Sequence, residues 1–130
     1  MQKPLWIAAG LLALVLAIPQ LLADDVASVD VRQAQQMRDQ GALLLDVREP
    51  EEYAALHAPG TKLIPLGELQ ARLPEIEAYK DKPVAVVCRS GRRSARAVEL
   101  LKAAGFTRVS NVEGGMLAWQ QSGLEVVRQQ

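Results

Sequence analysis

The stretch Cys88-Arg89-Ser90-Gly91-Arg92-Arg93-Ser94 joins a predicted buried strand to a predicted helix, and the rest of the sequence is best interpreted from it. The apolar run 83–87 before it is typical of a central parallel strand, with a proline at the first position, where a strand tolerates one. The segment 95–104 after it carries charged residues at three-residue intervals on an apolar background, which predicts a helix. Gly105 stands where a left-handed residue would end that helix.

Cys88, the only cysteine, lies in this loop, where backbone N–H groups and the positive end of a helix dipole converge. Arg89, Arg92 and Arg93 add positive charge, and cations lower the pKa of a nearby thiol. Gly91 would let the loop curl so that its amides point inward at an anion. We therefore predict a reactive thiolate in a positively charged pocket that suits an anionic substrate.

The alternative for a single cysteine is a small buried apolar side chain at the end of a strand. Cations beside the thiol favour the reactive interpretation, because a purely structural thiol gains nothing from them. Without a second cysteine, Cys88 cannot form an internal disulfide. One His and one Cys supply too few soft ligands for a metal site, so we expect neither a metal nor another cofactor.

Three motifs, in order along the chain, resemble those of the rhodanese-like domain, the fold of thiosulfate and persulfide sulfurtransferases. Cys-x-x-Gly-x-Arg-Ser at 88–94 resembles the active-site loop of that family. Leu-Leu-Asp-Val-Arg-Glu-Pro-Glu-Glu-Tyr at 44–53, followed by His-Ala-Pro-Gly at 57–60, resembles its upstream motif. Asn-Val-Glu-Gly-Gly-Met-Leu-Ala-Trp at 111–119 resembles its C-terminal motif, so the resemblance extends over about residues 28–124.

Strands that alternate with helices predict an α/β fold, and the resemblance implies a rhodanese-like one: a central parallel sheet of about five strands with helices on both faces. In such a sheet, ligands bind at the carboxyl ends of the strands, where Asp46, Cys88 and Asn111 would meet. The expected strands are 26–29, 43–47, 62–64, 83–87 and 108–112, and the expected helices are 30–40, 49–55, 67–69, 76–79, 95–104 and 116–121.

The resemblance implies a sulfurtransferase reaction. Thiolate Cys88 would attack the outer sulfur of an anionic donor such as thiosulfate, sulfite would leave, and a thiol or cyanide would remove sulfur from the resulting persulfide. Arg93 matches the arginine of the family motif and would stabilise the transition state, while Arg92 would point to solvent and steer anions. The expected substrate-binding residues are Arg89, Ser90, Gly91, Arg92, Arg93 and Ser94.

Asp46 and Arg48 match the upstream motif, and they either take part in the site or only brace the central loop through ion pairs and hydrogen bonds. His57 is a candidate acid or base, but a histidine before Ala-Pro-Gly more often supports a turn. Trp119 is expected in the core.

Two other functions remain open. A cysteine phosphatase or arsenate reductase needs five residues between its cysteine and arginine, whereas four separate Cys88 from Arg93, which favours attack on sulfur. A rhodanese module that relays sulfur or binds a partner without turnover of its own is the second alternative.

Residues 1–23 have the layout of a secretory signal peptide: Lys3, an apolar core, a helix breaker and the small residue Ala23 at the boundary. The alternative is a membrane anchor formed by residues 5–23, which approach the ~20 apolar residues that a span needs. Both predict export to the periplasm or cell envelope, of a domain that covers residues 24–130 and is either soluble after cleavage or anchored.

The charge of the exported domain is close to zero. Of the 15 Lys and Arg only Lys3 precedes residue 24, whereas all 15 Asp and Glu lie within residues 24–130. Because the basic residues cluster at one loop and form no broad face, we expect no nucleic acid partner.

Overall fold

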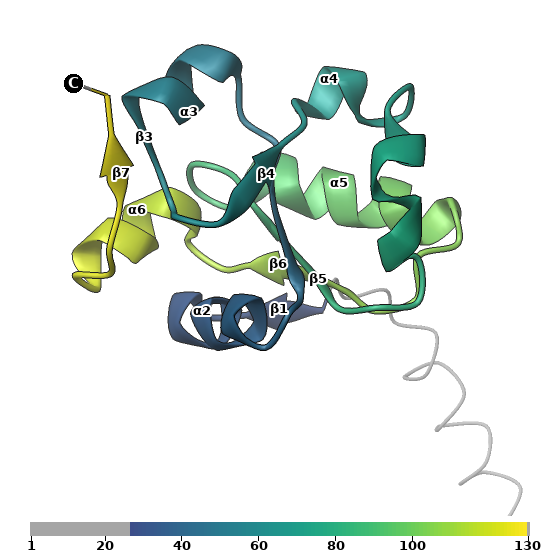
Figure 1. Ribbon diagram of the computed structural model, residues 1–130, viewed down its shortest axis with the longest axis horizontal. Coiled ribbons are helices and arrows are strands. Elements are labelled where there is room, and N and C mark those ends of the chain that lie inside the picture. The colour runs from purple at the N-terminus through teal and green to yellow at the C-terminus, as the bar shows by residue number, and fades with distance from the viewer. Residues whose placement is uncertain (1–26, 130) are drawn as a thin grey trace, which may run out of the picture.

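A five-stranded parallel sheet forms the centre of the computed structural model, which describes residues 27–129 (Figure 1). The strand order is β1-β6-β5-β2-β4, and every neighbouring pair is parallel. The predicted fold class is therefore confirmed, whereas the expected export segment 1–23 lies outside the described residues. The strands are β1 (Ser28–Val29), β2 (Leu43–Asp46), β4 (Thr61–Leu63), β5 (Val84–Val87) and β6 (Val109–Val112).

Helices cover both faces of this sheet, as the alternating pattern predicts (Figure 1). One face packs against α2 (Val31–Asp39) and α6 (Gly115–Gln121). The other packs against α4 (Leu66–Leu69), the 3₁₀ helix η1 (Leu73–Tyr79) and α5 (Arg92–Ala103). No helix within residues 27–129 has both the length and the apolar character needed to cross a membrane.

The central strand β5 shows how the sequence alternates between the two faces. Val84 and Val86 pack on the side of α5, whereas Ala85 and Val87 pack on the side of α2 and α6. All four are at most 1% exposed, as expected for a strand between two helical layers. The alternation continues past the end of β5 and brings the side chain of Cys88 to the α5 side.

The helix boundaries follow from local signals in the sequence. Asp30 is the N-cap of α2 and forms a capping box. Its carboxylate accepts a hydrogen bond from the backbone amide of Gln33, and the Gln33 side-chain oxygen accepts one from the backbone amide of Asp30. Pro50 occupies the first position of α3 (Pro50–Ala55), where the missing N–H costs nothing. The helix predicted over 95–104 begins earlier, at Arg92, because Gly91 already turns the chain into it.

A second sheet is absent from the sequence prediction, which took 108–112 as the last strand. In the structure β3 (Leu56–His57) pairs antiparallel with β7 (Val127–Arg128). Leu56 is extended, with φ −167° and ψ 130°, so α3 ends before it. The pairing joins segments about seventy residues apart, and two-residue strands carry no periodicity that a local pattern could reveal.

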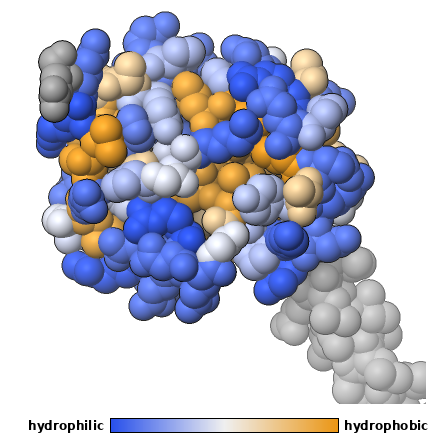
Figure 2. All heavy atoms as spheres, in the orientation of Figure 1, coloured by the Kyte–Doolittle hydropathy of each residue, from blue (hydrophilic) through white to orange (hydrophobic). Residues whose placement is uncertain are grey.

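The face of the domain that Figure 2 shows is mainly hydrophilic. The space-filling view in Figure 2 shows hydrophilic side chains over most of this side, with apolar ones gathered near its middle. Among residues 27–129 two large apolar side chains stand out as exposed, Leu117 at 38% and Val127 at 42%.

Candidate active site

Cys88 directly follows β5 and lies beneath the beginning of α5. The residue is only 1% exposed, yet its sulfur contacts the loop rather than apolar groups alone. Gly91 has a φ of +112°, a left-handed conformation that L side chains adopt at a steric cost, and it is the N-cap of α5. The chain therefore curls around the sulfur between the strand and the helix.

Hydrogen bonds from the loop favour the thiolate form of Cys88. The amide of Gly91 donates to its Sγ over 3.0 Å, and the Ser94 hydroxyl lies 3.3 Å from Sγ. Burial raises the pKa of the thiol, but the Ser94 hydroxyl and the amides of Ser94, Gly91 and Ser90 lower it by more, so the pKa of Cys88 lies below its usual value. The predicted ring of inward-facing amides is therefore present.

The arginines contribute less to this pKa than the sequence suggests. Arg89 and Arg92 are exposed, and the largest contributions that lower the pKa of Cys88 come from the loop hydrogen bonds. Arg93 does interact electrostatically with Cys88, and this interaction raises the pKa of Arg93 in addition to the larger effect of Glu52. Water and salt screen the effect of surface charges on the thiol, whereas the amides fixed in the loop donate to the sulfur directly.

Ser94 and Asn111 stabilise the loop through side-chain hydrogen bonds. The buried Ser94 hydroxyl lies 2.5 Å from Asn111 Oδ1, and the Asn111 side-chain Nδ2 donates to the carbonyl of Gly91 over 3.2 Å. A hydroxyl has one hydrogen, so Ser94 donates either to Cys88 Sγ or to Asn111. Ionisation of the thiol favours the first arrangement. Asn111 meets Cys88 at the rim of the sheet as predicted, and it acts through Ser94 and Gly91.

The first turn of α6 holds the other side of the loop. The Met116 amide donates to the Cys88 carbonyl over 2.8 Å, and the Leu117 amide donates to the Arg89 carbonyl over 3.1 Å. This contact needs a glycine at 115, because a Cβ there would lie 2.4 Å from the Cys88 carbonyl oxygen and 2.6 Å from that of Arg89. The loop is thus fixed by two helices and one strand.

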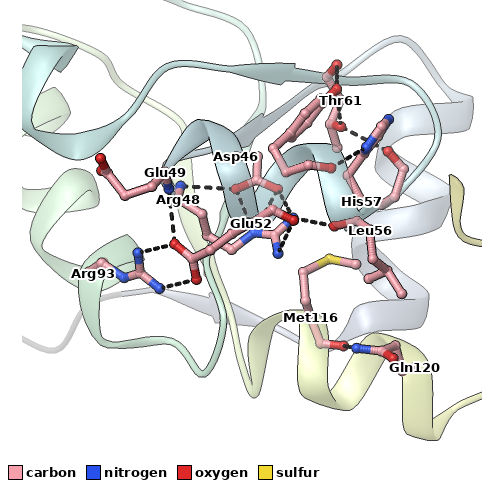
Figure 3. Close-up of polar contacts among 12 residues, drawn as sticks. Asp46, Arg48, Glu49, Glu52, Leu56, His57, Thr61, Arg93, Met116 and Gln120 are labelled. Carbon is pink, nitrogen blue, oxygen red and sulfur yellow. Dashed lines mark hydrogen bonds and ion pairs between the residues drawn. The ribbon is translucent and has the colours of Figure 1, made fainter. Parts of the chain in front are cut away.

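Glu52 is a site residue that sequence reasoning missed. Its carboxylate accepts two hydrogen bonds from the Arg93 guanidinium, over 2.7 and 3.0 Å (Figure 3). The hydrogen bond from Arg93 lowers the pKa of Glu52 to about 2, so this ion pair persists until the pH approaches that value. Two of the five guanidinium N–H groups are used in this way, and the others stay available to an anion.

Asp46 and Arg48 form a buried ion pair that supports α3. Arg48 Nη2 lies 2.8 Å from Asp46 Oδ2, and Asp46 is 0% exposed. The same guanidinium donates to the backbone carbonyls of Leu56, over 2.8 Å, and of Glu52, over 3.4 Å (Figure 3). The pair therefore holds the backbone of Glu52, which in turn holds Arg93, so its link to the reactive loop is indirect.

His57 and Trp119 have structural roles. The ring of His57 stacks on Tyr53 with centroids 3.8 Å apart, and its Nδ1 lies 2.7 Å from the Tyr53 carbonyl oxygen. Both contacts are with Tyr53 of α3, so they give His57 a structural role at the end of that helix, and support of the Ala-Pro-Gly turn stays a prediction. Trp119 is fully buried, as predicted, and its indole donates to the Glu125 carbonyl.

Two surface grooves, of about 380 and 340 Å³, lie away from the thiol. They share Met37 and Pro83, at the opposite end of the sheet, and neither is lined by a residue of the 88–94 loop. The loop itself encloses the sulfur closely. Neither groove is therefore the place where a reagent would meet Cys88.

We expect Ser94→Ala to raise the pKa of Cys88, because it removes a hydrogen bond that stabilises the thiolate. The ultraviolet absorbance of the thiolate, followed through a pH titration, measures the midpoint. Ser90→Ala is the matched control, since only the amide of Ser90 acts on the sulfur. Equal midpoints for Ser94→Ala and the unchanged protein would contradict this account of the thiolate.

We expect Arg48→Met to destabilise the fold by about 3–5 kcal/mol, because it leaves the buried Asp46 carboxylate without its cation. Urea unfolding measures the loss. Arg72→Met is the control: it removes an arginine with two carboxylate partners, Glu68 and Glu75, at the surface. Its effect should be much smaller, since water already screens those pairs. Similar losses in the two variants would contradict a structural role for the Asp46 pair.

Comparisons with known proteins agree with this geometry. A family model described as the rhodanese-like domain matches residues 29–122. The uncharacterised protein slr1261 of Synechocystis is 40% identical over 72% of this chain and 52% of its own length, so the chain spans about half of that relative. The thiosulfate sulfurtransferase GlpE of Pseudomonas fluorescens is 39% identical over 68% of this chain and 79% of its own length. A crystal structure of a rhodanese-related protein from Thermoplasma volcanium has a TM-score of 0.70 at 35% identity and covers 78% of this chain and 97% of its own.

Proposed function

The chain belongs to the rhodanese-like domain family, and from this membership we propose that it is a sulfurtransferase that carries sulfane sulfur on Cys88. Its donor is a small anion such as thiosulfate, and its acceptor is a thiol or cyanide. The observation that carries this proposal is the sulfur of Cys88 held by the Gly91 amide and the Ser94 hydroxyl, at the end of a central strand.

The proposed reaction has two displacement steps. The Cys88 thiolate attacks the outer sulfur of thiosulfate, an S–S bond forms on the enzyme, and sulfite leaves with the electron pair of the bond that breaks. The acceptor then attacks the outer sulfur of the persulfide, and Cys88 departs as a thiolate again. The lowered pKa of Cys88 serves both steps, since it favours the nucleophile in the first and the leaving group in the second.

Negative charge spreads over the sulfurs and the departing oxyanion in each transition state. The loop amides already point at the position of the sulfur, so they stabilise this charge without reorganisation. Arg93 would offer the N–H groups that Glu52 leaves free. Arg89 and Arg92, at the surface, would attract the donor from solution.

A side-by-side assay distinguishes this proposal from its alternatives. The protein is incubated with thiosulfate and cyanide in one reaction and with an aryl phosphate in another. We expect thiocyanate in the first and no phosphate release in the second, because four residues separate Cys88 from Arg93 and a phosphatase loop has five. Phosphate release without thiocyanate would favour the phosphatase, and the absence of both products would favour a module that binds a partner without turnover.

We expect Arg93→Ala to raise the KM for thiosulfate roughly ten- to a hundredfold, the value of one or two lost charged hydrogen bonds. Part of this effect would come from the Glu52 carboxylate, which loses its partner and repels the donor. The double variant Arg93→Ala with Glu52→Gln removes that repulsion and should recover part of the loss. Steady-state kinetics with thiosulfate and cyanide measure both, and unchanged kinetics in Arg93→Ala would rule out its role.

We also propose that this domain acts outside the cytoplasm. The support is the sequence of residues 1–23, which has a basic start, an apolar core and a small residue at the boundary. Fractionation of cells that express the full chain, with N-terminal sequencing of the product, tests export and cleavage together.

A further inference from the structure

Three arginines near the beginning of α5 carry charges that no carboxylate within residues 27–129 pairs with. Arg89, Arg92 and Arg96 are exposed, and none of them forms an ion pair in the described part of the chain. Glu99 lies one helical turn from Arg96 but forms no ion pair with it. Arg93, in the same turn, differs because Glu52 neutralises it.

This arrangement is unfavourable for the isolated domain. The first turn of α5 contains no acidic residue, so its cations oppose the helix dipole. Arg92 and Arg96 are four residues apart on one helix face, and like charges at this spacing repel each other. A bound group with several negative charges would reverse both effects.

A small anion at the sulfur cannot account for all three charges. Arg96 lies one helical turn, about 5.4 Å along the axis, beyond Arg92 and further from the loop that holds Cys88. A ligand that meets Arg96 as well as the thiol must therefore be considerably larger than thiosulfate.

Leu117 adds an exposed apolar side chain close to the backbone of Arg89. It is 38% exposed, and its amide donates to the carbonyl of Arg89, which places its backbone beside the loop that holds Cys88. A large apolar side chain near an exposed arginine is typical of protein interfaces. Single-stranded nucleic acid would instead use exposed aromatic side chains, and Arg89, Arg92, Arg96 and Leu117 include none.

We propose that Arg89, Arg92, Arg96 and Leu117 form a docking surface for an acidic protein that carries the accepting thiol. This inference rests on the proposed function and specifies its acceptor. The thiolate of the docked protein attacks the outer sulfur of the Cys88 persulfide, and a new S–S bond forms on the partner. The S–S bond on Cys88 breaks, Cys88 leaves as a thiolate, and the partner carries the persulfide, so no oxidant or reductant is consumed.

Two synthetic peptides test this inference. Each contains one cysteine, flanked by Asp and Glu in one peptide and by Lys in the other. The full chain is loaded with thiosulfate, freed of excess donor and mixed with both peptides, and mass spectrometry follows the gain of one sulfur, ~32 Da, on each. We expect transfer to the acidic peptide to be about tenfold faster at low salt, and the ratio to fall as salt screens the charges.

Charge reversal at two positions of α5 completes the test. Arg96→Glu should lower the ratio of the two rates severalfold, and the ratio cancels any change in the reactivity of Cys88. Lys102→Glu is the matched control, because this exposed residue lies near the other end of the helix. The inference would be overturned by equal transfer rates for the two peptides, or by a change of the ratio in Lys102→Glu as large as that in Arg96→Glu. It would also be overturned if a single-stranded oligonucleotide, rather than an acidic peptide without cysteine, blocked transfer to the acidic peptide.

The proposed function is tested separately within the same experiment. Cyanide added to the loaded wild-type protein should release thiocyanate whatever the peptides do. Thiocyanate without any preference for the acidic peptide would contradict only the docking surface. A chain that cannot be loaded at all would contradict the sulfurtransferase proposal.

Discussion

Gly115→Ala should destabilise the fold by about 2–5 kcal/mol and greatly reduce sulfur transfer. Gly115 has a φ of +54°, which costs an alanine about 1–2 kcal/mol. The added Cβ would also lie 2.4 to 2.7 Å from backbone atoms of Cys88 and Arg89, and overpacking of this kind costs about 1–3 kcal/mol more. The colliding atoms are backbone atoms, so the loop itself has to move.

The loss of transfer follows from that movement. The hydrogen bonds from the Met116 and Leu117 amides hold the carbonyls of Cys88 and Arg89, and they would lengthen when α6 is pushed away. The sulfur would then lose its alignment with the donor amides. Urea unfolding and thiocyanate formation from thiosulfate measure the two effects on the same preparation.

Gly123→Ala provides the matched control for this prediction. Gly123 follows the other end of α6 with a φ of +73°, and a Cβ there would meet nothing within 4 Å. It should therefore cost only about 1–2 kcal/mol, from backbone conformation, and leave transfer unchanged. If both variants lose activity to the same extent, close packing of α6 against the loop is not what positions Cys88.

Cys88→Ser should lower thiocyanate formation roughly a thousandfold or more, the scale seen when a covalent nucleophile is removed. An alkoxide is not available near neutral pH, and a hydroxyl cannot form the persulfide. The fold should survive, because serine is of similar size and can still accept the hydrogen bond from the Gly91 amide. Its unfolding transition in urea should stay close to that of the unchanged protein.

The result is informative only if the variant is folded. Substantial residual turnover by folded Cys88→Ser would mean that another group carries the sulfur. Because the sequence contains no second cysteine, that outcome would exclude a persulfide mechanism altogether.

The sequence predicts the sheet and the place of the thiol well, because both depend on local signals. The apolar run before Cys88, the proline at the start of α3 and the capping residue Asp30 each act over a few neighbours. Motif resemblance then places the reactive loop at the carboxyl end of the central strand, where the structure has it.

What the sequence does not reveal depends on contacts between distant segments. Glu52 forms a capping-box contact with Glu49, a local signal that can be read from the sequence, but its ion pair with Arg93 joins residues 41 positions apart. The source of the low pKa of Cys88 is another example. The number of arginines in the loop suggests that their charges are the main cause of the lowered pKa. In the structure the main causes are backbone amides and a serine hydroxyl that the curled loop places at the sulfur.

The state of the sulfur after exposure to a donor tests the central claim most directly. The protein is incubated with thiosulfate without reductant, freed of excess donor, digested and analysed by mass spectrometry. We predict that the peptide containing Cys88 gains ~32 Da and that cyanide removes the gain with release of thiocyanate. A peptide that keeps its original mass, in protein shown to be folded, would contradict the claim that Cys88 carries sulfur.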